Sequence, residues 1–129
     1  ITTGSSVSAN PEAMLEGSRM HRKIQREQKA TYQSEVPLKM EWNESGYKLV
    51  LEGRADGIDW IEKEGEKLYY IDEIKCVYKN IEEIDEAEAL HLAQAKCYAY
   101  LYGHRQDLEK IGVQITYCHL ETEEIQRIF

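Results

Sequence analysis

The spacing of hydrophobic residues predicts a long helix at the start of the chain. Asn10-Pro11-Glu12 is a typical helix beginning, because Asn caps free amides, Pro fits the first helical position and Glu complements the helix dipole. The pattern predicts that this helix runs from about Pro11 to about Thr31.

Extended segments follow the first helix. Val36 to Trp42 has strand composition, Asn43-Glu44-Ser45-Gly46 is a turn signal, and beyond it Tyr47, Leu49 and Leu51 alternate with polar neighbours. These residues predict a strand, a turn and a second strand.

A second turn leads into a third strand. Lys63-Glu64-Gly65-Glu66 separates Arg54–Ile61 from Lys67–Tyr78, and the latter has the apolar density of a central strand. The three strands therefore form an antiparallel meander.

Helical spacing returns after the meander. Hydrophobic residues recur every three or four positions between Glu86 and His104, and Gly103 marks the expected end of this second helix. Ile111 to Leu120 is again typical of a strand, and Ile125–Phe129 has the composition of the start of another. The predicted order of elements is α-β-β-β-α-β.

Length and composition indicate one globular domain. The chain has 129 residues, of which 42% are hydrophobic and 31% charged, and no apolar run approaches the ~20 residues of a membrane helix. We expect a single domain over residues 1–129, excised from a longer chain, since the polar start lacks an initiating Met and a signal pattern. The formal net charge of -8 argues against nucleic acid as a partner when averaged over the whole surface.

The cysteines favour a reducing compartment. Cys76, Cys97 and Cys118 are far apart and have apolar or aromatic neighbours, whereas zinc and iron–sulfur sites need closely spaced thiolates. We expect buried, reduced thiols in a cytoplasmic protein.

The middle hairpin is predicted to bring two carboxylates together. If Glu64-Gly65 is a two-residue loop, Lys63 faces Glu66, and the same register sets Asp56 opposite Glu73. Directly opposed like charges are destabilising unless a cation lies between them. A divalent metal ion with oxygen ligands is the natural candidate.

Glu73 and Lys75 interrupt an apolar strand. They share one face of it with Tyr69, Ile71 and Val77. Buried charges cost several kcal/mol each unless they are paired or bound to metal, so two of them on a central strand suggest a retained site. The alternative is a simple Glu–Lys ion pair near the edge of the sheet.

Three segments together resemble a known nuclease family. They are Gly53-Arg54-Ala55-Asp56-Gly57-Ile58, Ile71-Asp72-Glu73-Ile74-Lys75 and Gln94-Ala95-Lys96-Cys97-Tyr98. In this order they are similar to the PD-(D/E)XK nuclease superfamily, in particular its RecB-like branch. That branch includes the nuclease domains of RecB and AddB helicase–nucleases, Cas4, and nuclease domains fused to Rad3/DinG-type helicases.

The resemblance implies a fold and a site. The fold would be α+β with a three-layer restriction-endonuclease-like core, in which helices flank a central mixed sheet. Asp56 and Glu73 would be acidic metal ligands and Lys75 the catalytic lysine. His21 and the backbone carbonyl of Ile74 would complete the metal ligands, and Gln94 and Tyr98 would contact substrate.

The implied cofactor is Mg²⁺ or Mn²⁺, with no iron–sulfur cluster, because flanking cysteines are missing. The implied activity is exonuclease-type hydrolysis of DNA phosphodiesters in repair or recombination. The partners would be a single-stranded or double-stranded DNA end and a helicase domain in the same chain, with no membrane. The alternative is a catalytically inactive domain of this fold with a structural or strand-binding role, and a third reading is an unrelated α+β enzyme.

Some of these residues also have interpretations that involve no catalytic site. His21 could be a half-exposed helix residue, Tyr98 could pack in the core, and His91 has no assigned role. The first helix is locally basic, so its potential could steer phosphate even though the whole chain is acidic. Its cations are Arg19, Arg22, Lys23, Arg26 and Lys29.

Overall fold

The computed structural model describes residues 11–78, 84 and 87–129. Its elements, in chain order, are α1 (Pro11–Arg26), β1 (Gln33–Glu44), β2 (Tyr47–Lys63), β3 (Glu66–Val77), α2 (Ala89–Gln106), β4 (Gly112–His119) and β5 (Ile125–Ile128). The predicted order of elements is confirmed, and the segment at Ile125–Phe129 does form a further strand. Asn10, the predicted helix cap, and Glu86, the predicted start of the second helix, lie outside the described residues.

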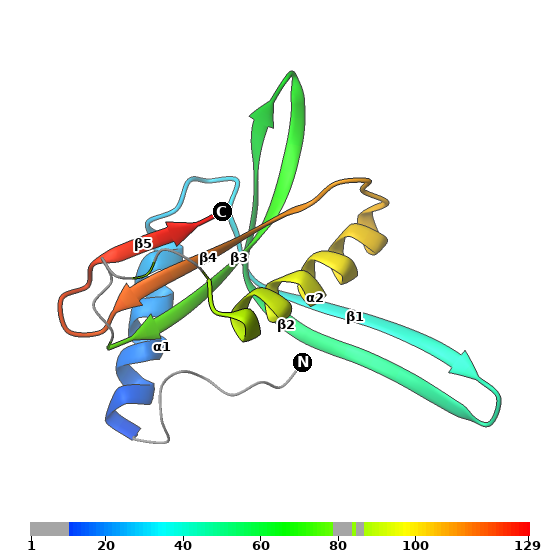
Figure 1. The fold of residues 1–129 in the computed structure, drawn as a ribbon, viewed down its shortest axis with the longest axis horizontal. Helices are drawn as coiled ribbons and strands as arrows, with labels where there is room; N and C mark the ends of the chain where they lie inside the picture. The colour runs from blue at the N-terminus through cyan, green and yellow to red at the C-terminus, as the bar shows by residue number, and fades with distance from the viewer. Residues whose placement is uncertain (1–10, 79–83, 85–86) are drawn as a thin grey trace.

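The strands form one mixed sheet in the order β1-β2-β3-β4-β5. β1, β2 and β3 pair antiparallel, as the meander prediction requires. β4 pairs parallel to β3, with α2 as the connection between them, and β5 pairs antiparallel to β4. The sheet lies between α1 on one face and α2 on the other (Figure 1).

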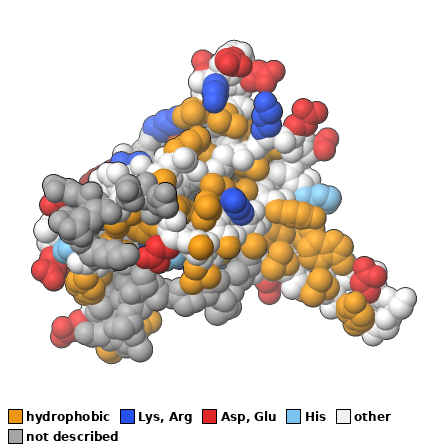
Figure 2. Space-filling model, viewed as in Figure 1, with side chains coloured by type: hydrophobic (Ala, Val, Ile, Leu, Met, Phe, Trp, Pro, Cys, Tyr) orange, Lys and Arg blue, Asp and Glu red, His pale blue; other side chains and the backbone are white. Residues whose placement is uncertain are grey.

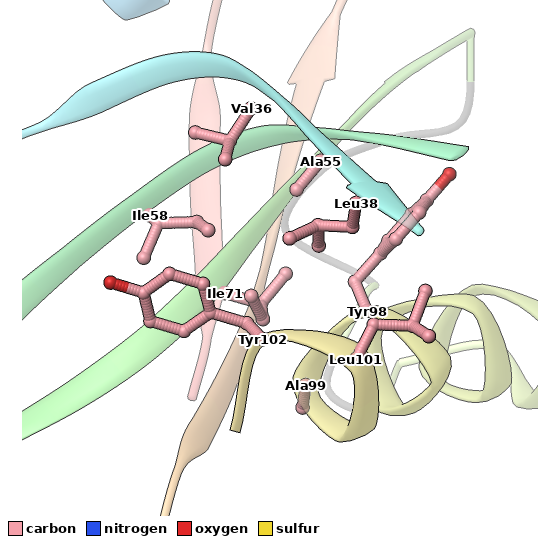
Figure 3. Close-up of a cluster of buried hydrophobic side chains, with 9 residues drawn as sticks. All are labelled: Val36, Leu38, Ala55, Ile58, Ile71, Tyr98, Ala99, Leu101 and Tyr102. Atoms are coloured by element: carbon pink, nitrogen blue, oxygen red, sulfur yellow. The ribbon is translucent and has the colours of Figure 1, made fainter. Parts of the chain in front are cut away.

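Alternation along the strands supplies a core on each face of the sheet. On the α2 face, Ala55, Ile58 and Ile71 pack against helix residues that include Tyr98 and Leu101 (Figure 3). On the α1 face, the helix residues Met20 and Ile24 pack against Ile74 and Cys76 of β3, Cys118 of β4 and Leu120, which follows β4. Helices on both faces leave β3, the third of five strands, buried from both sides.

The first helix is shorter than predicted, because it ends at Arg26 rather than near Thr31. The side-chain amide of Gln28 donates to the carbonyl of Ile24 at the helix end (2.9 Å), and the chain then turns across the sheet. Thr31 lies outside the helix, and its hydroxyl donates to the buried carboxylate of Asp59 (2.6 Å). Long-range contacts of this kind are invisible to helical spacing.

The second helix runs past Gly103, the predicted stop, to Gln106. Gly103 is buried inside the helix, where an added Cβ would lie 3.6 Å from Ile111. The helix is ended instead by Asp107 in the left-handed conformation (φ 54°, ψ 50°), which Asp tolerates better than most residues. Cys76 and Cys118 are buried as expected, whereas Cys97 is only half-buried.

Two hairpins project from the sheet (Figure 1). Gly46 (φ +84°) and Gly65 (φ +82°) occupy turn positions that favour glycine. The outer part of the β1–β2 hairpin carries hydrophobic side chains on the face shown in Figure 2. Tyr47 and Leu49 are among the exposed hydrophobic residues of β2. In the described part of the chain, no helix is long and apolar enough to cross a membrane.

Candidate active site

The β2–β3 hairpin has the register that the sequence predicts. Lys63 pairs with Glu66, and the ladder continues to Gly57 opposite Asp72. The ladder ends at that pair, and Asp56 and Glu73 are the residues next to it on the two strands. The backbone N–H of Ile74 donates to Asp56 Oδ2 (2.7 Å), which fixes the Asp56 carboxylate against β3 beside Glu73.

Lys75 completes the cluster on the same strand as Glu73. Its Nζ lies 3.9 Å from Glu73 Oε1, with side-chain exposures of only 11% for Lys75 and 7% for Glu73. This ion pair is longer than a good charge-assisted hydrogen bond and lies on the central strand. The pair of Glu73 and Lys75 is therefore not the simple ion pair near the sheet edge that the sequence leaves as an alternative.

The cluster is short of hydrogen-bond donors. Glu73 Oε2 is buried and has no hydrogen-bond partner within the described structure. A buried carboxylate oxygen without a donor is costly and calls for an explanation. Two carboxylates with a free oxygen suit a hard divalent cation, which takes oxygen ligands and keeps several waters. No group of three or more His, Cys, Asp or Glu side chains in residues 11–78, 84 and 87–129 is arranged to hold a metal ion, so the fit rests on the carboxylate pair.

The two carboxyl groups have opposite pKa shifts. Burial and the neighbouring charge of Asp56 raise the pKa of Glu73 far above its ordinary value. Burial also opposes ionisation of Asp56, but hydrogen bonds with His21 and Glu73 outweigh it, so the pKa of Asp56 is lowered. Without a cation, the two carboxyl groups therefore resist being ionised together.

His21 approaches the pair from α1. Its Nδ1 lies 3.5 Å from Asp56 Oδ1. Burial alone would lower the pKa of His21, but hydrogen bonds with Asp56 and Cys76 raise it to about 10. A charged imidazole next to Asp56 already occupies the place that a cation would take, and it must lose its proton before it can bind metal. The ligand role of His21 stays a prediction.

The two α2 residues differ in how they meet the site. The negative charges of Glu73 and Asp56, after burial, raise the pKa of the Tyr98 hydroxyl, which also contacts the Arg54 backbone. The Tyr98 ring packs at the margin of the core cluster with its hydroxyl turned away from the other labelled side chains (Figure 3). Gln94 is buried, and its Oε1 has no hydrogen-bond partner among the described atoms. Both substrate roles stay predictions.

The basic surface of α1 is weaker than the sequence suggests. Lys23 and Arg19 form ion pairs with Glu123, at 2.6 and 4.0 Å, and Arg19 also pairs with Glu16. Lys29 donates to the Trp60 carbonyl near Asp59. Tertiary contacts therefore engage three of the five cations.

One residue beside the site was missed by the sequence reasoning. Gln25 follows His21 by one helical turn, and its side-chain amide donates to the backbone oxygen of Asp56 (2.8 Å). The i,i+4 spacing to His21 is the signal that would have found it.

A family model matches nearly the whole chain. It covers residues 6–128 and represents the PD-(D/E)XK nuclease superfamily. The chain belongs to the PD-(D/E)XK nuclease superfamily. Asp56 lies on β2, and Glu73 and Lys75 lie on the neighbouring strand β3, but their roles as metal ligands and catalytic lysine stay predictions.

A solved structure supports the restriction-endonuclease-like fold of this superfamily member. The crystal structure of SSO0001 matches with a TM-score of 0.66 and 23% sequence identity, over 92% of this chain and 52% of that chain. This chain thus spans about half the length of SSO0001, and identity at this level shows the fold alone. A search of the curated proteins finds no match.

Proposed function

We propose that this superfamily member is a divalent-metal-dependent deoxyribonuclease of the RecB-like branch. The observation that supports it best is the buried pair of Asp56 and Glu73, one oxygen of which has no donor, next to the nearly buried Lys75. A pair of this kind destabilises the fold unless it serves a cation. The class of reaction is phosphodiester hydrolysis.

The ligands in this proposal are oxygen atoms on two strands and a helix nitrogen. Asp56, Glu73 and the Ile74 carbonyl would hold Mg²⁺ or Mn²⁺, and His21 would join them once deprotonated. When bound, the cation supplies a Lewis acid for the scissile phosphate and lowers the pKa of a water molecule. An imidazole ligand favours Mn²⁺ over Mg²⁺.

Lys75 is the catalytic lysine in this proposal. Its ammonium group lies on the same face as Glu73, where it can orient the attacking water or neutralise charge on the pentavalent phosphate. Tyr98 and Gln94 would contact the substrate from α2 through the hydroxyl and the unpaired amide.

The wider role belongs to the same proposal. We place the domain in the cytoplasm as the nuclease part of a longer helicase–nuclease, where it acts on DNA ends in repair or recombination as an exonuclease. Because ion pairs engage much of the basic α1 surface, the isolated domain should bind DNA weakly and gain affinity from the rest of such a chain.

A catalytically inactive domain is the second candidate function. The ion pair of His21 with Asp56 favours it, because that pair partly neutralises the acidic cluster without metal. The test is degradation of linear single- and double-stranded DNA by the purified chain with Mn²⁺ or with EDTA. We expect degradation with Mn²⁺ only, and far slower degradation by Lys75→Ala. Absence of wild-type cleavage on every substrate would favour the inactive domain.

A further inference from the structure

Two residues of helix α1 contact Asp56. His21 approaches the carboxylate, and Gln25, one turn later, donates to the Asp56 backbone oxygen (2.8 Å). The same Gln25 amide nitrogen also donates to Glu35 Oε1 on β1 (3.0 Å). A single side chain thus joins the helix to both strands beside the candidate metal ligand.

The backbone geometry of β1 and β2 is irregular at the point where Gln25 contacts them. Ala55 and Ile58 are three residues apart, so regular alternation would turn them to opposite faces, yet both pack in the same core cluster. β1–β2 pairing joins Ser34 to Gly57 and then Val36 to Ala55. Between these pairs Glu35 takes a positive φ of 52°, which a non-glycine residue rarely adopts.

Asp56 lies in this irregular stretch, between Ala55 and Ile58. Its carboxylate accepts a hydrogen bond from the Ile74 N–H on β3, and its carbonyl accepts one from Gln25. The positive φ of Glu35 persists only where surrounding contacts hold it. Gln25 makes contacts on both strands, to the Asp56 carbonyl and to the Glu35 carboxylate.

We propose that Gln25 is a positioning residue of the nuclease site. It holds the irregular backbone at Asp56 and Glu35 and thereby keeps the Asp56 carboxylate in place to bind a divalent cation. It acts through Asp56 and needs no contact with substrate or metal. The inference rests on the proposed function, because Asp56 must be a metal ligand for its position to matter.

The test compares two substitutions of similar shape on the same helix end. Gln25→Met keeps the length of the side chain and removes the donor, and Gln28→Met removes an amide whose described bond is to the Ile24 carbonyl. Binding of Mn²⁺ alone is measured by titration calorimetry below the unfolding range, with circular dichroism to confirm the fold. We expect Gln25→Met to weaken Mn²⁺ binding about 10- to 100-fold and Gln28→Met to leave it unchanged.

A rescue separates positioning from general stability. Glycine takes a positive φ without strain, so Glu35→Gly added to Gln25→Met should restore part of the Mn²⁺ affinity. Folded Gln25→Met that binds Mn²⁺ like the wild type would overturn the positioning role, as would equal losses in the Gln28→Met control. If the wild type does not bind Mn²⁺, or if Asp56→Ala binds it like the wild type, the proposed function itself fails.

Discussion

Asp72 and Glu73 are neighbours on β3 and both are buried, yet their surroundings differ completely. Asp72 Oδ1 accepts hydrogen bonds from the Thr116 hydroxyl (2.6 Å) and the Gln114 amide (3.1 Å), and its Oδ2 accepts one from the Tyr32 hydroxyl (2.6 Å). Glu73, on the other face, has a lysine at 3.9 Å, a second carboxylate beside it and one oxygen without a donor.

The difference separates a structural acid from a functional one. A carboxylate with several donors stabilises the fold through charge-assisted hydrogen bonds, and Asp72 ties the loop after α1 to β3 and β4 in this way. A pair of acids with too few donors destabilises the fold and is better explained by a ligand. The following predictions test that separation, from the largest expected effect to the smallest.

Loss of Lys75 should have the largest effect, and it should fall on catalysis alone. Lys75→Ala should lower Mn²⁺-dependent cleavage about 1,000-fold, equivalent to roughly 4 kcal/mol of transition-state stabilisation, because no other described cation lies as close to Glu73. Single-turnover assays on linear DNA measure it, with the exposed Lys63→Ala as control. Wild-type rates in a folded Lys75→Ala protein would refute the catalytic role.

Loss of Asp72 should affect the fold instead. Asp72→Ala leaves two hydroxyls and an amide without their acceptor, and should lower the free energy of unfolding by about 3 kcal/mol. Urea denaturation measures the loss, and Mn²⁺ binding by the folded fraction should persist. An intact fold that no longer binds Mn²⁺ would place Asp72 on the functional side of the comparison.

Glu73→Gln should do the opposite, with increased stability and lost metal binding. Because Gln is neutral, folding no longer has to take up the proton that the raised pKa of Glu73 demands, and we expect the melting temperature in EDTA at pH 8 to rise by about 4 °C, an effect near 1 kcal/mol. The exposed Glu62→Gln is the matched control. Lower stability in Glu73→Gln would mean that Glu73 serves the fold.

The same pair sets a pH dependence with a definite sign. Glu73 has a raised pKa in the folded state, so folding takes up a proton and stability falls as pH rises from about 4.5 towards that raised value. His21, raised from 6.5 to about 10, acts in the same direction over that range. Melting temperatures in EDTA should therefore fall between pH 6.5 and 9. The fall should be smaller in Glu73→Gln, and an equal fall would contradict the assignment.

The smallest effect should come from Tyr98. Tyr98→Phe keeps the ring in the core cluster and removes only the hydroxyl near the carboxylates, so stability should hardly change. Loss of one hydrogen bond to substrate, worth about 1 kcal/mol, should raise KM about fivefold with little change in kcat. Unchanged kinetics would leave Tyr98 a packing residue.

Local patterns were enough to predict much of this fold. The register of the β2–β3 hairpin follows from Glu64-Gly65, and this local turn is enough to predict that Asp56 lies beside Glu73. The early end of α1 and the late end of α2 depend on contacts with distant residues such as Asp59 and Ile111, which no local pattern contains.

The site was predicted less completely than the fold. Its acids follow from spacing and resemblance, but Gln25 donates to the Asp56 backbone across 31 positions of sequence, where the strand alternation is broken. The donors of Asp72 come from three separate segments, at Tyr32, Gln114 and Thr116. Only the tertiary structure shows that both oxygens of Asp72 accept hydrogen bonds, whereas Glu73 Oε2 accepts none from the described residues.

The most direct test of the central claim is the location of Mn²⁺ by anomalous diffraction from soaked crystals of the chain. The account predicts a peak between the carboxylates of Asp56 and Glu73 that disappears in Glu73→Gln, and none at Asp72. A peak elsewhere, or no peak at saturating Mn²⁺ with the carboxylates ionised, would contradict it.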